Sequence, residues 1–385
     1  MATRRSMQPK LRRRRQWTGA LAIALVILLI GSIGYVWYQR NVVAIRDYEG
    51  DGNGKIVMVR VDAGDSVSSL APQLVEKGVV GSRRALMSAA EKEEPSLQQG
   101  YYPLQEEMSA DKALKILTDD ESRRGVVDIP NGLTLDDLTV VGGEPRPGIY
   151  TLVSQQTCQD ETTCVTPQQL KDAVAQTSAE ELGLPDWAGE AVDSRGADPR
   201  KLEGLIAPGV HLFDPTAEPL AIAQDLIHDS VDSFEGTGLV DSANRVGLTP
   251  YELLTAASLV EREAPEGDFD KVARVILNRL EINQKLEFDS TVNYSISEQE
   301  VATTSADRAR ETPWNTYAKE GLPATPIASP GLQAVHAMEN PAEGDWLYFV
   351  TVDLDGRTVF NREFSDHEAA ISESLDNGVL DSNRE

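Results

Sequence analysis

Histidine and cysteine are scarce in this chain of 385 residues, which holds four of the first and two of the second. No His-Glu-x-x-His segment occurs, so the common zinc-hydrolase motif is absent. No Gly-x-Ser-x-Gly segment occurs either, which disfavours a serine hydrolase of the α/β type. The histidines show no triad-like motif; they are His211, His228, His336 and His367.

Basic residues are few beyond the N-terminus. Residues 1–40 hold eight of the 36 Lys and Arg and none of the 62 Asp and Glu, so the remainder carries 28 basic against 62 acidic residues. Such a surface repels DNA, RNA and anionic lipid, and we therefore expect no nucleic-acid partner. General solubility is a sufficient explanation for the diffuse negative charge.

Long apolar runs are also missing, with one exception, Trp17–Tyr38, which contains no charged residue. A helix of that length can cross a hydrocarbon core of about 30 Å. Most of the flanking Lys and Arg precede the run, which favours a cytoplasmic tail over residues 1–16, a single-pass helix over 17–38, and the remainder outside the cell membrane. A cleaved signal peptide is the alternative, but the run is too long and no small-residue cleavage site follows it.

The two cysteines, Cys158 and Cys164, have five residues between them. On the oxidising side of a membrane an even pair most often forms a disulfide. A metal site would need further ligands, and this segment contains no histidine. We therefore expect a disulfide that closes a short loop.

The pattern beyond a linker over residues 39–54 predicts an α+β protein. Residues 55–135 read as a small domain, with strands near 55–61, 100–102 and 126–129 and helices beginning near 67, 82 and 109. Residues 136–200 are rich in Pro, Gly, Asp, Thr and Gln with weak periodicity, and we interpret them as a loop-rich insertion. A larger α+β domain is expected over 201–372, with a marked helix over 220–234, followed by a polar tail over 373–385.

The best-defined helix is expected over residues 248–264. Thr249 is a natural N-cap and Glu252 completes a capping box. Glu261 and Glu263 lie near its end on opposite flanks of the apolar face, so the helical wheel does not choose between them. A glutamate at such an edge gains proton affinity, as a general acid requires, whereas the alternative is a surface ion pair with Arg262.

Five segments in order add a resemblance: AASLVEREA, DKVARVILNRL, LEFDSTVNY, WNTYAKEGLPATPIASPG and WLYFV. Together with LEGLIAPGVH at 202–211, they resemble the MltG/YceG-like endolytic murein transglycosylases. The resemblance is close over residues 201–370 and loose over 55–135, where GDSVSSLAPQL is similar to the family's LysM-like module. It implies a YceG-like catalytic domain over 201–372.

The resemblance also implies roles for single residues. Glu261 follows the stretch that matches the family's ASIV and is implied as the catalytic residue, with Glu263 as its neighbour. Glu203, in the Leu-Glu-Gly match, is implied to position the sugar or to orient Glu261. Asn131 departs from the family's usual Pro-Glu-Gly, and Pro330-Gly331 reads as turn-setting. A groove lining or loop scaffolding is implied for Asp289, Thr291, Tyr294, Asn315 and Tyr317.

The implied reaction is a lytic cut of the MurNAc–GlcNAc β-1,4 bond within peptidoglycan strands, which leaves 1,6-anhydro-MurNAc ends. One carboxyl group suffices if Glu261 is first acid and then base, and no metal or cofactor is required. A muramidase that uses Glu203 or Asp289 as a second carboxylate is one alternative, and a non-catalytic wall-binding scaffold is another. By analogy, the family suggests an enzyme that terminates new strands near penicillin-binding proteins.

Overall fold

The computed structural model describes residues 25–35, 46–93, 95–140, 144–158, 164–265, 267–296, 298–299 and 303–379. These residues fall into two compact units. The smaller comprises the described residues up to Gln98 together with Pro103–Ser122, and the larger comprises Gln99–Tyr102 and the described residues from Arg123 onward.

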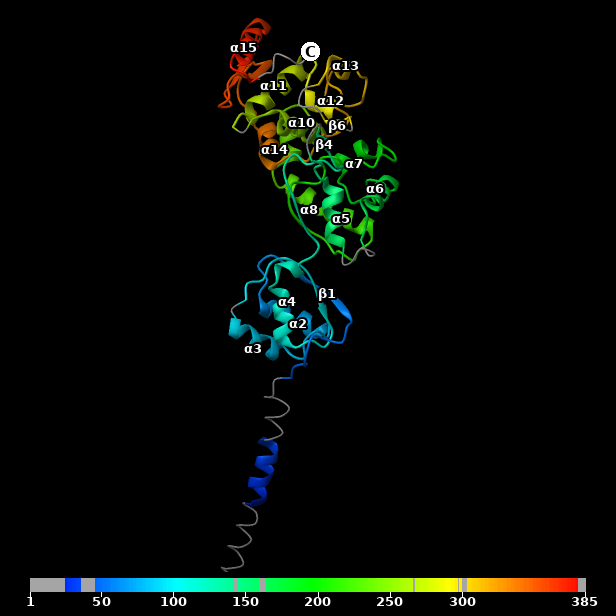
Figure 1. The fold of residues 1–385 in the computed structure, drawn as a ribbon, viewed down its shortest axis with the longest axis vertical. Helices are drawn as coiled ribbons and strands as arrows, with labels where there is room; N and C mark the ends of the chain where they lie inside the picture. Colours follow the sequence, from blue (N-terminus) through cyan, green and yellow to red (C-terminus); the bar gives the residue numbers. More distant parts are fainter. Residues whose placement is uncertain are drawn as a thin grey trace, which may run out of the picture. The chain divides into compact units, whose positions relative to one another are not determined.

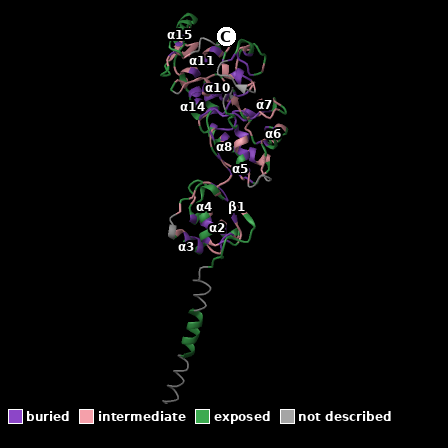
Figure 2. Ribbon diagram, viewed as in Figure 1, coloured by how far each residue is buried: buried purple, intermediate pink, exposed green. Residues whose placement is uncertain are grey.

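The predicted membrane anchor is described only in its middle part. Residues 25–35 form a helix whose apolar side chains are exposed (Figure 2). Within the part of the chain that the structure describes, no helix is both long and apolar enough to cross a membrane. The predicted tail over 1–16, residues 17–24 and 36–38 of the run, and residues 39–45 of the linker lie outside the described residues, so the anchor stays a prediction.

The smaller unit follows the order strand, helix, helix, strand, helix. Ser66 caps its first helix through a capping box with Ser69, and the apolar positions Leu70 and Leu74 of that helix are buried. The two strands, β1 and β2, pair in one sheet. Its elements are β1 (Ile56–Val61), α2 (Val67–Glu76), α3 (Arg83–Glu93), the second half of β2 (Gly100–Gln105), α4 (Ala110–Leu117) and a short 3-10 turn η2 (Asp120–Ser122). The first half of β2, up to Tyr102, counts with the larger unit.

The third strand expected in the small domain belongs to the larger unit instead. β3 (Val126–Ile129) pairs antiparallel with β5 (Gly209–Leu212), so that Val126 lies opposite Leu212. The smaller unit therefore ends at Ser122 rather than at the expected residue 135. A lone strand pattern gives no sign of its partner, and this partner lies more than 80 residues away.

Helices dominate the larger unit, and its strands pair only two by two (Figure 1). β3–β5 and β7–β8 are antiparallel, and β4–β6 is parallel. Its other elements in chain order are β4 (Thr139–Val140), α5 (Ile149–Thr157), α6 (Pro167–Gln176), α7 (Asp186–Asp193), α8 (Pro219–Glu235), α9 (Leu239–Arg245), α10 (Pro250–Glu263), α11 (Phe269–Glu281), α12 (Asp289–Asn293), β6 (Glu298–Gln299), α13 (Ser305–Arg308), α14 (Leu332–Glu339), β7 (Tyr348–Thr351), β8 (Thr358–Asn361) and α15 (Phe364–Asp376). The tail expected from residue 373 thus begins inside α15.

The central helix of the larger unit is α10, which packs against α9, α11 and α14. Thr249 and Glu252 form the expected capping box, and Pro250 occupies the first turn. Tyr251 and the eight residues from Leu253 through Val260 are buried, so the helix is enclosed on almost every side (Figure 2). The end of α10 is therefore the part that can carry solvent-accessible chemistry.

The prediction of a loop-rich insertion over residues 136–200 is wrong where the chain forms the helices α5, α6 and α7. The apolar residues of these helices, among them Val153, Leu170 and Val192, belong to the main core. The sequence does not reveal these helices clearly, because α6, for example, buries only Leu170 and Val174, and two apolar positions are too few to show a helical period. A disulfide joins Cys158 to Cys164 between α5 and α6, the pair expected from the sequence.

Candidate active site

Glu261, in the last turn of α10, is half-buried and faces two glycines. Its Oε2 accepts a hydrogen bond of 3.0 Å from the main-chain N–H of Gly331. On the other side lies Gly132, where an added Cβ would be 3.7 Å from the Cγ of Glu261. Burial raises the pKa of Glu261 above its usual range, and the Gly331 N–H and the charge of Arg262 only partly oppose this. Glu261 is thus shifted toward the protonated form that a general acid needs.

The two glycines beside Glu261 belong to segments that pair with each other. The N–H of Gly132 donates to the carbonyl of Ser329, and the N–H of Ser329 donates to the carbonyl of Leu133, both at 2.8 Å. A Cβ at Gly331 would lie 2.5 Å from the side-chain nitrogen of Asn131, so any larger residue there would have to displace the exposed side chain of Asn131. Sequence reasoning identified Pro330-Gly331 as a turn but missed that its N–H binds the candidate acid.

Glu263 lies apart from Glu261, toward α12. It accepts a hydrogen bond of 3.3 Å from the N–H of Ser290. Burial first, and then the negative charge of Asp289, raises the pKa of Glu263, against the hydrogen bonds from Ser290 and the charge of Arg262. The helical wheel did not distinguish Glu261 from Glu263, but in the structure the two carboxyl groups have different neighbours.

Glu203 is almost completely buried, with 1% of its surface exposed. Its Oε1 accepts from the N–H of Leu135 at 3.2 Å, and its Oε2 accepts from the hydroxyl of Tyr294 at 2.9 Å. Burial raises the pKa of Glu203 to about 8, so the carboxyl is largely protonated at neutral pH. The following residue, Gly204, has φ +71°, and an added Cβ would lie 2.3 Å from Pro326, so this turn requires glycine.

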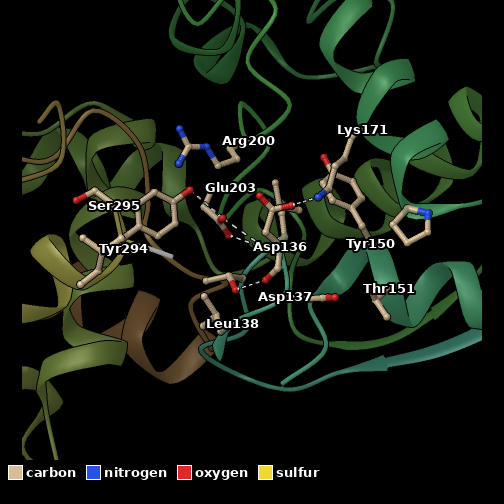
Figure 3. A pocket seen from close by; sticks show the side chains of 14 residues that line it. Asp136, Asp137, Leu138, Tyr150, Thr151, Lys171, Arg200, Glu203, Tyr294 and Ser295 are labelled. Carbon is tan, nitrogen blue, oxygen red and sulfur yellow. Dashed lines mark hydrogen bonds and ion pairs between the residues drawn. The ribbon is translucent and has the colours of Figure 1, made fainter. Parts of the chain in front are cut away.

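A polar cavity of about 520 Å³ opens above Glu203 (Figure 3). Glu261 is not part of its lining, but the two sites share one segment: Gly132 lies beside Glu261, and Leu135 binds Glu203. Three residues span at most about 10 Å, so the cavity is close to the candidate acid. The lining consists of Thr134, Leu135, Asp136, Asp137, Leu138, Tyr150, Thr151, Pro167, Lys171, Arg200, Glu203, Tyr294, Ser295 and Ile296.

Asp289 is engaged by three other side chains. It accepts from Thr303 and from Tyr317, each at 2.7 Å, and both carboxylate oxygens accept from Arg308. Although burial acts to raise it, these hydrogen bonds hold the pKa of Asp289 below its usual range. In this structure Asp289 and Tyr317 tie α12 to the segment after α13.

Thr291 and Asn315 lie in the same network and are buried. The hydroxyl of Thr291 is 2.9 Å from that of Thr316, and the side-chain amide of Asn315 donates to the carbonyl of Arg308 at 3.0 Å. Of the five residues for which groove lining and scaffolding were both open, only Tyr294 lines the cavity. The other four contact one another or nearby main chain.

Sequence reasoning missed the charged residues of the cavity. Arg200 lies 4.5 Å from the ring centre of Trp314 and 5.8 Å from that of Tyr294. Lys171 forms an ion pair of 2.6 Å with Asp136. No motif marked them, although the Thr166–Gln169 capping box signals the helix that carries Lys171.

A half-buried glutamate with a raised pKa, close to a polar cavity, is the arrangement of an acid–base enzyme. In the described residues, no group of three or more His, Cys, Asp and Glu could hold a metal ion. Residues 59–373 match the YceG-like family, and the chain belongs to that family.

Similar proteins carry names that describe one activity. A protein named "Endolytic murein transglycosylase" from Bacillus subtilis is 27% identical to this chain, over 82% of this chain and 83% of its own length. A protein of the same name from Streptococcus pneumoniae is also 27% identical, over 92% of this chain and 65% of its own length. A crystal structure from Listeria monocytogenes, titled a putative YceG-like protein, has a TM-score of 0.50 at 21% identity and covers 82% of this chain and 99% of its own. That likeness concerns the fold.

Proposed function

We propose that this protein is an endolytic lytic transglycosylase of peptidoglycan, which cleaves the MurNAc–GlcNAc β-1,4 bond within glycan strands. Relatives that align over most of the chain are named endolytic murein transglycosylases. The observation that carries the proposal is the position of Glu261, half-buried, held by the Gly331 N–H, and with a raised pKa.

Glu261 acts twice in the proposed reaction. Protonated, it donates to the oxygen that bridges MurNAc and GlcNAc, and the C1–O bond breaks as the N-acetyl group of the substrate stabilises the positive centre. The resulting carboxylate then takes the proton of the MurNAc C6 hydroxyl, whose oxygen bonds to C1 and closes the 1,6-anhydro ring. Glu261 ends as it began, and no water is consumed.

Hydrolysis of the same bond by the usual two-carboxyl mechanism would need a second carboxylate to activate water or to act as nucleophile. Asp289 is already bound by Thr303, Tyr317 and Arg308. Glu203 is sealed from solvent and largely protonated at neutral pH, so it is a poor base. These contacts favour the one-carboxyl reaction over a muramidase.

Mass analysis of the products from purified sacculi tests the proposal. We expect muropeptides that end in 1,6-anhydro-MurNAc, released from within strands with EDTA present. Products with reducing MurNAc ends alone would assign the protein as a muramidase. No release at all would favour a wall-binding scaffold.

The proposal extends to location and partners. The uncharged run over residues 17–38 with its basic flank supports a single-pass anchor with the catalytic domain outside the cell membrane. The strand–helix–helix–strand order of β1, α2, α3 and β2, with paired strands, supports a LysM-like module that contacts peptidoglycan. A strand-terminating enzyme would work beside penicillin-binding proteins.

A further inference from the structure

The cavity above Glu203 carries more charge than a glycan strand requires. Two anions, Asp136 and Asp137, and two cations, Lys171 and Arg200, line it. The alternating sugars of peptidoglycan are neutral N-acetylated residues, which hydroxyl and amide groups can bind. Charge in peptidoglycan lies in the peptide stems, which carry free carboxylates and amino groups. The lining therefore matches a charged peptide better than a sugar.

The cations stand on two sides of the cavity, each beside a tyrosine (Figure 3). Lys171 lies 6.0 Å from the ring centre of Tyr150, and Arg200 lies 5.8 Å from that of Tyr294. Cations packed beside aromatic rings keep their side chains in defined directions and bind carboxylates well. Glu203 lies between them as a largely neutral carboxyl, so it does not repel an anionic group.

These charges are available to a ligand. The side chains of Lys171 and Asp136 are 27% and 38% exposed, and ion pairs at that exposure exchange readily with other partners. Asp137 is exposed, and its Oδ1 accepts from the N–H of Gly148 at 2.7 Å. A carboxylate of the peptide could therefore replace Asp136 as the ion-pair partner of Lys171. An ammonium group of the peptide could form an ion pair with Asp136 or Asp137.

The location fits the chemistry of the strand. The peptide stem hangs from the lactyl group at C3 of MurNAc, a few ångströms from the C1 at which Glu261 would act. Segment 132–135, at most about 10 Å long, connects the glycine beside Glu261 with the amide that binds Glu203. Resting on the proposed function, we infer that this cavity binds the peptide stem of the MurNAc whose C1 is cleaved. The walls that carry Tyr150 and Lys171 come from α5 and α6.

A comparison of two substrates tests this inference. Strands with intact peptide stems and strands stripped of their stems by an amidase, which leaves a lactyl carboxylate on MurNAc but removes all peptide carboxylates and ammonium groups, are digested by the full-length protein. The value of kcat/KM is measured on each. We expect the wild type to prefer intact strands. Lys171→Gln and Asp137→Asn should each lower the ratio of the two kcat/KM values about tenfold, the effect of losing one charge-assisted hydrogen bond.

Lys271→Gln is the matched control, because Lys271 also forms an ion pair of 2.7 Å, with Asp268, but lies outside the cavity lining. It should keep the wild-type ratio. A wild type without preference, or an unchanged ratio in both cavity variants, would overturn the inference. Glu261→Gln separates it from the proposed function, because loss of acid–base chemistry stops both substrates equally.

Discussion

Three glutamates near the site, Glu203, Glu261 and Glu263, are shifted toward the protonated form, and the first two differ in what they can reach. Glu203 is 1% exposed and has donors on both oxygens, so its proton has little access to a substrate. Glu261 is half-buried and accepts a hydrogen bond from the N–H of Gly331 on one of its oxygens. A general acid must keep its proton until the substrate binds, and its carboxyl group must be able to reach the substrate. Glu261 meets both conditions.

Glu261→Gln is therefore the decisive substitution. Glutamine keeps the shape and removes the transferable proton, and the acid and base steps both depend on it. Loss of general acid–base catalysis typically lowers the rate about 10²- to 10⁴-fold, and we expect a loss at or beyond the upper end of that range. Release of anhydro-muropeptides from sacculi measures it.

The neighbouring glutamates provide controls for that experiment. Glu263 faces Ser290, so Glu263→Gln should reduce the rate far less. Glu203→Gln should be intermediate, because it alters the hydrogen bond from Tyr294 at the cavity. Full activity in Glu261→Gln would remove our assignment of the site.

Glu203 should also make stability depend on pH. Its pKa is about 8 in the folded protein and about 4.3 in an unfolded chain, so between these values the folded state binds the extra proton. Stability from this group is complete below about pH 4 and is lost as pH rises toward 8, by at most about 1.4 kcal/mol per unit.

Urea unfolding of wild type and Glu203→Gln at pH 5 and pH 8 measures this effect. Tryptophan fluorescence is suited to it, because Trp187, Trp314 and Trp346 all lie in the larger unit and none lies between residues 46 and 122. We expect the advantage of wild type over the variant to shrink as pH rises. Parallel pH profiles would show that Glu203 is ionised in the folded protein.

At the level of elements, sequence predicts best where local signals are complete. The Thr249–Glu252 capping box and a long apolar run define α10, and Ser66 defines the start of α2. The partner of β3 and the helices α5, α6 and α7 were not predictable in this way. Strand pairing at long range leaves no local mark in the sequence, and the short helices α6 and α7 bury only two residues each, too few to show a helical period.

The same limit applies to the candidate site. Glu261 and Glu203 could be named from their sequence blocks. That Gly331 donates to Glu261, and that Lys171 and Arg200 line one cavity with Glu203, depends on how distant segments pack. Hydrogen bonds from main-chain groups, and charged side chains on helices that contain no motif, cannot be assigned to a site from a single sequence.

The disulfide gives a prediction about α5 and α6. It closes a loop with a sequence separation of only 6, so chain entropy gives it about 2 kcal/mol of stability. The helices it joins are also fixed by buried residues such as Val153 and Val174. The double substitution Cys158→Ser, Cys164→Ser should lower the free energy of unfolding by about that amount and leave activity nearly intact. Thiol titration of the unreduced native protein should find no free cysteine.

For the whole molecule, the charge asymmetry around residues 17–38 predicts the topology. Arg12 to Arg15 should lie in the cytoplasm and everything after about Arg40 outside. Protease added to intact spheroplasts should digest both compact units and leave a short protected fragment. A full-length chain that survives this treatment would contradict the predicted orientation.

The Gly331 contact also bears on how the protein can change over generations. Its donor is a main-chain N–H, so no replacement of a side chain at 331 deletes the donor itself, unless proline enters. The restriction on substitutions at position 331 is steric, because a Cβ there would collide with the side-chain amide of Asn131. Variation at the two positions should therefore be linked, with larger residues at 331 more frequent where residue 131 is smaller than asparagine.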